Sequence, residues 1–259
     1  MGKFRAMNYD ITHILPAYNE AGRIRETVDQ AVAYFAAKQW TAQIIVSADG
    51  NDGTREIVRD MAKSNPHILC IGEDARRGKG RGIRDAVAHA EGRYVGFADA
   101  DNKVPIRDFD TVLPWLDKGI EVVIGSRALA TTSIEKKQPL YRQIGGKSFR
   151  YVMRALTGLT VGDTQCGFKF FPLHVAKTLF SLQQVDGYMY DVEILVIATR
   201  LGYRIKEVPV HWRDDGDSRL DLVSGNIRNM RDILRTSRLH RHLSPASAPQ
   251  AATTVAQLR

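Results

Sequence analysis

The chain has 259 residues, of which 44% are hydrophobic and 25% charged, and its formal net charge is +8. This apolar fraction is enough for an ordinary core, which excludes a chain that is disordered throughout. The length fits one large α/β domain or two small ones. The excess of basic residues indicates an anionic partner, such as a phosphate compound, a nucleic acid or a membrane surface.

The sequence also disfavours a disulfide-rich secreted protein and a membrane-spanning protein. Only two cysteines, Cys70 and Cys166, are present, and they provide neither a disulfide framework nor the spacing of a metal site. The first ten residues lack the apolar segment of a signal peptide. Since no apolar run reaches about 18 residues, we expect no transmembrane helix.

In chain order, the first half alternates short apolar runs with amphipathic stretches. Strands are predicted over residues 11–18, 42–48, 67–71, 93–98 and 121–126, with Pro16 stopping the first, and helices over 20–38, 53–64, 80–91 and 107–118. This alternation predicts an α/β fold with a mostly parallel sheet covered by helices on both faces. Ligands of such sheets bind beyond the carboxyl ends of the strands.

The second half is more basic and ends in a segment of different composition. Helices are predicted near residues 143–157, 174–182, 188–202 and 221–243, and a strand over 203–212. The Ser/Ala/Pro-rich end is typical of disorder. The predicted organisation is a single domain over residues 1–220, a basic amphipathic helix over 221–243 and a disordered tail over 244–259.

Polar clusters follow three of the predicted strands, at residues 18–20, 49–52 and 99–101. Turns and helix caps would account for each cluster alone. Because the three strand ends share one edge of a parallel sheet, a divalent-metal site becomes the better interpretation. Asp99 and Asp101, one residue apart, supply the carboxylate oxygens that hard cations prefer.

The glycine-rich segment RRGKGRG, residues 76–82, does not match a phosphate-binding loop, because Lys79 is followed by Gly80 instead of Ser or Thr. Its basic residues would face an anion at a helix N-terminus or form a solvated loop. They do not alternate with aromatic residues as in single-strand nucleic-acid platforms, and no helix-turn-helix pattern is present. We therefore expect no nucleic-acid partner.

Six ordered segments resemble the family-2 glycosyltransferases of the GT-A fold: ILPAYNE, IIVSADGNDGT, RRGKGRGI, FADADNK, VIGSR and DTQCGFKFF. The similarity is greatest to the members that transfer a sugar to dolichyl or polyprenyl phosphate, and it covers about residues 10–220. It implies an inverting, metal-dependent hexosyltransferase that forms a β-linked lipid-phosphate sugar. UDP-glucose is the favoured donor, and GDP-mannose is the alternative.

The resemblance also implies the residues of the site. It assigns nucleotide-sugar binding to Pro16, Tyr18, Glu20, Ser47, Asp49, Lys79, Asp99, Ala100, Asp101, Arg213 and Arg219. Asp99 and Asp101 would hold Mg²⁺ or Mn²⁺, and Arg127 and Arg142 would hold the acceptor phosphate. Asp99, Asp101 and Arg127 form the implied catalytic set.

The chain departs from the family pattern at three positions near these residues. Ala48 stands where the acidic turn usually has its first aspartate, and Gly146 stands where a serine usually follows the second arginine. Lys103 stands where the mannose synthases have a glutamine that helps to bind metal. A protonated lysine cannot be a ligand, so water would complete the metal's coordination.

The implied chemistry accounts for acidic clusters in a basic chain. A metal on two carboxylates would neutralise the nucleoside diphosphate leaving group. The acceptor phosphate is largely dianionic at neutral pH, so it needs positioning by arginines more than deprotonation. For Asp163, a structural or cation-orienting role is favoured over that of a base.

Residues 221–243 suggest how the chain reaches a lipid substrate. Apolar and basic side chains are interleaved there: Leu222, Ile227, Met230, Ile233, Leu234 and Leu243 with Arg228, Arg231, Arg235, Arg238 and Arg241. Such a helix lies in the headgroup layer of an anionic membrane, or it packs on the domain as an ordinary helix. We expect a cytoplasmic protein, peripheral at the cytoplasmic face of a membrane.

Two other classes of function use similar residues. A metal-dependent nucleotidyltransferase would also combine acidic metal ligands with basic phosphate contacts, but it would release pyrophosphate from a nucleoside triphosphate. A non-catalytic nucleotide-sugar binder would transfer no sugar.

Overall fold

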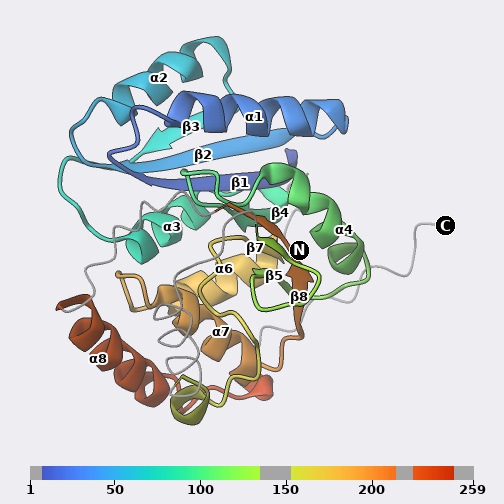
Figure 1. Cartoon of the computed structure of the whole chain (residues 1–259), viewed down its shortest axis with the longest axis vertical. Coiled ribbons are helices and arrows are strands. Elements are labelled where there is room, and N and C mark those ends of the chain that lie inside the picture. Colours follow the sequence, from blue (N-terminus) through green and yellow to red (C-terminus); the bar gives the residue numbers. More distant parts are fainter. Residues whose placement is uncertain (1–7, 135–152, 214–223, 248–259) are drawn as a thin grey trace, which may run out of the picture.

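The computed structural model describes residues 8–134, 153–213 and 224–247. A seven-stranded sheet with the order β3-β2-β1-β4-β7-β5-β8 runs through this part of the chain, and β6 and β9 form a separate pair (Figure 1). The strands are β1 (Tyr9–Tyr18), β2 (Ala42–Asp49), β3 (Ile68–Ile71), β4 (Gly92–Phe97), β5 (Val122–Ser126), β6 (Ser133–Ile134), β7 (Lys169–Pro172), β8 (Ile205–Pro209) and β9 (His211–Trp212). In the large sheet, β7 pairs antiparallel with β4 and β5, and the other pairings are parallel.

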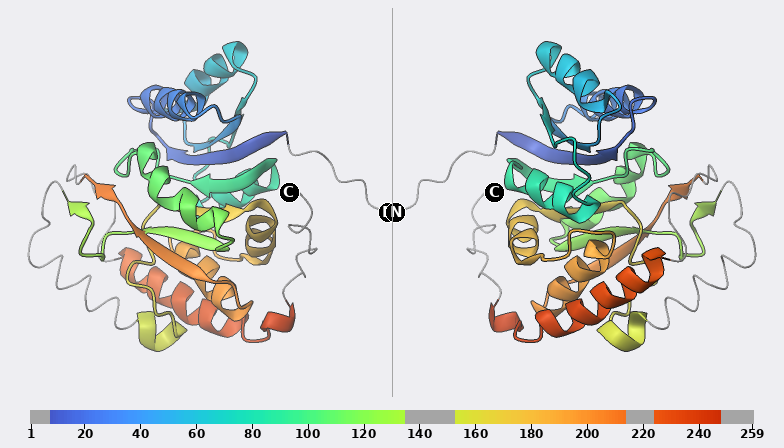
Figure 2. Two further views of the ribbon diagram at one scale, coloured as in Figure 1. Left: turned by 90° about the vertical axis from the view of Figure 1, so that its right-hand side faces the viewer. Right: turned by 90° about the vertical axis from the view of Figure 1, so that its left-hand side faces the viewer.

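Helices cover both faces of the sheet (Figure 1). They are α1 (Ile24–Ala37), α2 (Thr54–Ser64), α3 (Lys79–Ala88), α4 (Phe109–Asp117), α6 (Leu173–Leu182), α7 (Tyr190–Arg200) and α8 (Ser224–Leu239), with 3₁₀ turns at Ile106–Asp108 and Pro245–Ser247. One face packs against α1, α2 and α4, and the other against α3, α6 and α7. Figure 2 shows α8 beneath α7, on the opposite side of the molecule from α1 and α2.

The central strands are apolar on both sides because both faces of the sheet are covered. In β1, Ile11 and Leu15 enter the core under α1 and α2, whereas Ile14 enters the core on the α3 side. In β4, Tyr94 and Phe97 divide between the two cores in the same way. These continuous apolar runs confirm the predicted mostly parallel α/β sheet.

Two strand predictions were wrong in detail. Strands β6 and β7 were not predicted, and the single strand over residues 203–212 is two strands, β8 and β9, which belong to different sheets. The ladder between β5 and β8 ends at the pair Ser126–Pro209. Since proline has no N–H for a further ladder bond, the chain leaves the sheet there, and β9 pairs with β6.

Pro16 does not stop β1, which continues to Tyr18. The pairing of β1 with β4 ends at Ile14 and Phe97, and the carbonyl of Ile14 accepts the amide of Ala98 at 3.1 Å. Pro16 lies two residues beyond Ile14, so its nitrogen faces the same side, where the ladder has already ended. A proline is therefore tolerated in this central strand.

The C-terminal elements differ from the predicted boundaries. Helix α8 lies within the predicted 221–243, and Pro245–Ser247 form a 3₁₀ turn inside the segment that was predicted to be disordered. Pro245 lies against Gly202, which explains the ordered turn. Residues 153–157 are helical, but most of the helix predicted near 143–157 lies outside the described residues. No helix in the described ranges is long and apolar enough to cross a membrane.

His13 is a buried polar residue within the core on the α1 side of β1. Its ring stacks on Phe170 at 6.3 Å between centroids and meets the edge of Phe35 at 5.8 Å. Burial lowers the pKa of His13 to about 3. The side chain is therefore neutral in the folded protein at neutral pH.

We predict that His13 makes the fold sensitive to acid. Histidine in the unfolded chain titrates near 6.5, so below that pH the unfolded chain binds a proton that the folded protein does not. The free energy of unfolding therefore falls by about 1.4 kcal/mol for each pH unit below 6.5, until the pH approaches about 3. Replacing His13 by leucine removes this proton uptake. Urea unfolding between pH 7 and 5 should give a flatter dependence for His13→Leu than for the parent.

The control is His242→Gln at an exposed position, which should keep the parental pH dependence. An equal slope for His13→Leu and the parent would contradict the interpretation.

Candidate active site

The site is centred on the turn that follows β4. The amide of Asn102 donates to the carbonyl of Asp99 at 3.0 Å, and Asn102 has a φ of 55°, which asparagine tolerates better than most residues. From α1, the hydroxyl of Thr27 donates to the carbonyl of Ala100 at 2.9 Å. The turn is thus held by its own backbone and by a neighbouring helix, with Ala100 buried beneath it.

Each carboxylate of this turn is paired with a lysine. Lys79, the first residue of α3, contacts Asp99 through its ammonium group. Lys103 Nζ lies 3.2 Å from Asp101 Oδ2. Burial would lower the pKa of Lys79, but the carboxylates of Asp99 and Asp191 raise it on balance. Two ammonium groups therefore balance the two carboxylates of the turn.

Gly167, within DTQCGFKFF, leaves room for the Asp99 carboxylate against its backbone. A Cβ atom at residue 167 would lie 2.3 Å from Asp99 Oδ2 and 2.6 Å from its Cγ, closer than any real side chain approaches. The segment that contributes this glycine continues directly into β7. Glycine at this position explains how the backbone can approach the carboxylate so closely.

The residues present fit a hard divalent cation. The side chains of Asp99 and Asp101 are 39% and 22% exposed, so their oxygens can be reached from solvent. No group of three or more His, Cys, Asp or Glu side chains suited to a metal occurs among the residues that the structure describes. Two carboxylates would leave the other positions to the nucleotide phosphates and water, as is common for Mg²⁺.

Arg127, directly after β5, is held by Asp163. Its Nε donates to Asp163 Oδ2 at 2.7 Å, its Nη2 to Oδ1 at 3.0 Å and its backbone amide to Oδ2 at 3.0 Å. Burial would raise the pKa of Asp163, but the Arg127 guanidinium lowers it to about 2. These are the contacts of a residue that orients a cation. An ionised carboxylate that accepts three hydrogen bonds from an arginine is a poor base.

Arg127 and Asp99 belong to one electrostatic site. Burial opposes the charge of Arg127, but the carboxylates of Asp163 and, more weakly, Asp99 raise the pKa of its guanidinium. The guanidinium carbon lies 5.6 Å from the centre of the Trp212 ring. Trp212 is followed by Arg213, whose amide donates to the carbonyl of Lys103 at 3.0 Å, so an anion next to Arg127 would also lie near the acidic turn.

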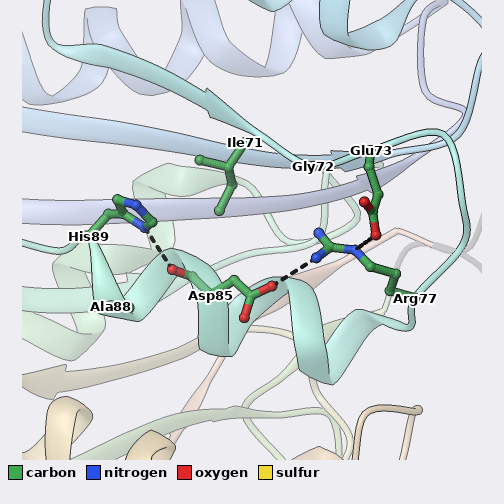
Figure 3. Close-up of a pocket in the computed structure, with 7 residues that line it drawn as sticks. All are labelled: Ile71, Gly72, Glu73, Arg77, Asp85, Ala88 and His89. Carbon is green, nitrogen blue, oxygen red and sulfur yellow. Dashed lines mark hydrogen bonds and ion pairs between the residues drawn. The ribbon is translucent and has the colours of Figure 1, made fainter.

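Asp49, at the end of β2, fixes the loop that leads into α3. Its Oδ2 accepts the amide of Arg77 at 2.9 Å, and its Oδ1 lies 3.4 Å from Arg77 Nη2. The Arg77 guanidinium also pairs with Glu73 at 2.8 Å and with Asp85 at 3.2 Å (Figure 3). Arg77 immediately precedes the glycine before Lys79, so Asp49 acts on the placement of Lys79.

A pocket of about 310 Å³ opens beside this arginine, between the end of β3 and α3 (Figure 3). It is lined by Ile71, Gly72, Glu73, Arg77, Asp85, Ala88 and His89. None of the residues predicted to bind the donor lines it. We therefore place the candidate active site at the strand ends near Asp99 and not in this pocket.

Tyr18, the last residue of β1, and Glu20, two residues later, already contact arginines. The Arg76 guanidinium lies 4.4 Å from the centre of the Tyr18 ring and donates to the hydroxyl of Tyr188 at 2.9 Å. Glu20 Oε2 lies 3.2 Å from Arg23 Nε. The loops after β1, β3 and α6 thus meet at the edge of the sheet where a donor was predicted.

Residues 12–180 match the model of glycosyl transferase family 2. The chain belongs to glycosyl transferase family 2. Its curated relatives include a dolichyl-phosphate beta-glucosyltransferase of Trichomonas vaginalis, 34% identical over 88% of this chain and 73% of that protein. Another, from Dictyostelium discoideum, is 30% identical over 88% of this chain and 74% of that protein. The family and the enzyme class predicted from the sequence are confirmed.

The fold of this family-2 glycosyltransferase matches solved structures. One is the glucosyl-3-phosphoglycerate synthase of Mycobacterium tuberculosis in complex with Mn²⁺, UDP and glucosyl-3-phosphoglycerate, with a TM-score of 0.63, 22% identity, and coverage of 89% of this chain and 80% of that one. At this level of identity the match establishes the fold alone. It confirms the predicted GT-A architecture, and it shows a divalent metal bound with UDP on that fold in another protein.

The structure of the glycosyltransferase places Ser47 and Pro16 in the sheet instead of at its edge. They pair in the ladder between β1 and β2. The Ser47 side chain is 4% exposed, and its hydroxyl faces α3, where a Cβ at Gly82 would lie 2.6 Å away. The predicted contacts of these two residues with the nucleotide stay predictions.

The predicted arginines of the second half are only partly described. The amide of Arg213 donates to the carbonyl of Lys103 at 3.0 Å, which brings the end of β9 beside the acidic turn. Arg142 and Arg219 lie outside the described residues. The structure therefore brings Arg213 to the site and leaves the other two as predictions.

Sequence reasoning missed a buried ion pair of the glycosyltransferase behind Asp99. Lys169 of β7 contacts Asp191 of α7 through its ammonium group and donates to the carbonyl of Cys166 at 2.7 Å. Lys169 is fully buried and Asp191 is 4% exposed. The signal in the sequence was YDVEILVIATR, in which Asp191 and Glu193 interrupt an apolar helix.

We predict that Asp163→Asn destabilises the fold. Loss of the charge weakens three hydrogen bonds from Arg127 in a nearly enclosed position, so the free energy of unfolding should fall by about 2 kcal/mol. Glu121→Gln is the matched control, because Glu121 pairs with an arginine whose side chain is 59% exposed, and it should cost less than about 1 kcal/mol. Urea unfolding at pH 7 measures both; equal losses would argue against a special role for Asp163.

Proposed function

We propose that this glycosyltransferase transfers glucose from UDP-glucose to the phosphate of a polyprenyl or dolichyl monophosphate, with inversion at C1. Two relatives with about a third of their residues identical are dolichyl-phosphate beta-glucosyltransferases, and the chain spans most of their length. The observation that carries the proposal is the joint placement of the Asp99 turn and Arg127. One side of the site suits a metal-bound diphosphate and the other a phosphate dianion.

The donor side consists of groups that bind phosphate or neutralise it. Lys79 lies at the N-terminus of α3, where a helix favours anions, and Arg213 adjoins the turn. Mg²⁺ or Mn²⁺ on Asp99 and Asp101 would neutralise charge on the UDP leaving group. Tyr18, at the end of β1, offers a ring that can cover the base.

The acceptor side needs an oriented cation more than a base. The lipid phosphate is mostly dianionic at neutral pH, so it can attack C1 without losing a proton first. Asp163 fixes the plane of the Arg127 guanidinium, and the proximity of Trp212 limits its movement. Direct attack from this side inverts an α-linked donor to a β-linked product.

We propose that α8 brings the enzyme to the membrane that contains its lipid substrate. Ile233 is fully buried in the core shared with α7, whereas Arg231, Arg235 and Arg238 are exposed and Leu234 is 40% exposed. At Ile233, therefore, the helix packs on the domain. Its basic outer side is free to meet anionic headgroups, and the cytoplasmic face of a membrane is the location that we propose.

A transfer assay with labelled donors tests the function. Purified protein, Mn²⁺ and a polyprenyl phosphate should give a labelled, alkali-stable lipid product from UDP-glucose and much less from GDP-mannose. A reversed preference would make the enzyme a mannose transferase. Pyrophosphate release from UTP with a sugar phosphate, or donor binding without transfer, would overturn the proposal.

We predict that Asp101→Asn lowers the rate of glucose transfer at least ~10²–10³-fold, because stabilisation of the leaving group's charge is lost. The expected loss appears in kcat under saturating donor and Mn²⁺, with an unchanged circular dichroism spectrum. Asp60→Asn, at a side chain that is 62% exposed on α2, should keep the parental rate. A folded Asp101→Asn enzyme with normal turnover would refute the assignment of the metal site.

We predict that the triple change of Arg231, Arg235 and Arg238 to glutamine weakens binding to vesicles that contain anionic lipid. Each basic residue near such a surface contributes roughly 1 kcal/mol. Vesicle sedimentation should show this loss, and the parental binding should weaken with added salt.

The control carries the same charge change on the face of the sheet that α1, α2 and α4 cover. Arg25, Arg59 and Arg107 are exposed, and their triple change to glutamine should leave vesicle binding nearly intact. Equal losses for the two triple variants would mean that net charge, and not α8, determines the interaction.

A further inference from the structure

Lys79 lies where the starts of α3 and α7 meet. Its ammonium group contacts Asp99 and lies 5.9 Å from the centre of the Tyr190 ring, which immediately precedes Asp191. The starts of the two helices touch, since a Cβ at Gly80 would lie 2.6 Å from Tyr190 Cβ. The negative charges of Asp99 and Asp191 both act on Lys79.

Asp191 is buried against a cation. It lies against the ammonium group of Lys169, which is fully buried and also donates to the carbonyl of Cys166. Burial raises the pKa of Asp191 on balance, and the charges of Lys169 and Lys79 offset part of that rise. Two carboxylate–ammonium pairs thus occupy this region, Asp99 with Lys79 at the edge of the site and Asp191 with Lys169 in the core.

A divalent cation on Asp99 would disturb this balance. It would compete with Lys79 for the same carboxylate and repel its ammonium group. An ammonium group with no carboxylate near it would be costly in this enclosed position. Asp191 follows Tyr190 at the start of α7, beside the start of α3, and offers a second carboxylate that would keep Lys79 paired.

We propose that Asp191 is a positioning residue that receives the Lys79 ammonium group when a divalent cation takes its place on Asp99. This inference rests on the metal site of the proposed function. Lys169 holds the Asp191 carboxylate in place in both states. Asp191 therefore favours metal binding by accepting the lysine that competes with the metal, in addition to any direct attraction between opposite charges.

A double-mutant cycle separates these two effects. Mn²⁺ affinity is measured by electron paramagnetic resonance of the free ion, first without nucleotide and then with UDP, and the cycle is run where the parent binds measurably. We expect Lys79→Met to tighten Mn²⁺ binding about tenfold and Asp191→Asn to weaken it about tenfold, within the usual range of coupling between sites. In the Lys79→Met background, Asp191→Asn should change the affinity less than about threefold.

Further variants keep the result decisive. If Asp191→Asn does not fold because Lys169 is left unpaired, the double change Lys169→Met with Asp191→Asn replaces it, with the same expectations. Asp186→Asn is the control for a nearby negative charge, because Asp186 pairs with Arg84 at 2.8 Å, and it should leave the affinity within about twofold.

Two results would overturn the inference, and they are distinguishable. An equal loss of affinity from Asp191→Asn with and without Lys79 would mean that Asp191 acts as a distant charge, and the metal site would stand. If the parent binds Mn²⁺ neither alone nor with UDP, the metal site itself is refuted. The proposed movement of Lys79 from Asp99 to Asp191 is then refuted as well.

Discussion

The carboxylate of Asp99 is held between the backbone of Gly167 and the ammonium group of Lys79, and the rest of the site is arranged around this contact. Asp99 follows β4, Gly167 precedes β7, and Lys79 begins α3. The antiparallel strand β7 lies between β4 and β5, so it brings the DTQCGFKFF segment under the acidic turn. A sheet of parallel strands alone would not place that segment there.

Charge balance explains why a basic chain carries so many carboxylates at one edge. Asp99 and Asp101 face Lys79 and Lys103, and Asp163 and Asp191 face Arg127 and Lys169. Each acid fixes the position of a cation that the proposed chemistry uses directly or indirectly. Substrates that bring a diphosphate, a monophosphate and a metal ion would rearrange these pairs without leaving a buried charge unpaired.

The sequence predicted the features that depend on local patterns. The parallel strands appeared as apolar runs, and Asp99, Asp101 and Asp49 appeared as polar clusters after them. Strand β7 was missed because four residues of antiparallel pairing depend on partners far along the chain. Lys169 and Asp191 were missed because charged residues within apolar stretches become interpretable only when the fold shows them paired in the core. The burial of Ser47 against α3 likewise follows from helix packing, which local patterns do not specify.

The most direct measurement of the central claim is the transfer rate of Gly167→Ala beside that of Gly22→Ala. Alanine at 167 must displace the Asp99 carboxylate, whereas a Cβ at Gly22 meets no atom within 4 Å. We predict that Gly167→Ala stays folded but loses at least about tenfold in kcat and in Mn²⁺ affinity, as misplacement of a catalytic group implies. Gly22→Ala should keep both values. Parental rate and metal affinity in Gly167→Ala would contradict the account.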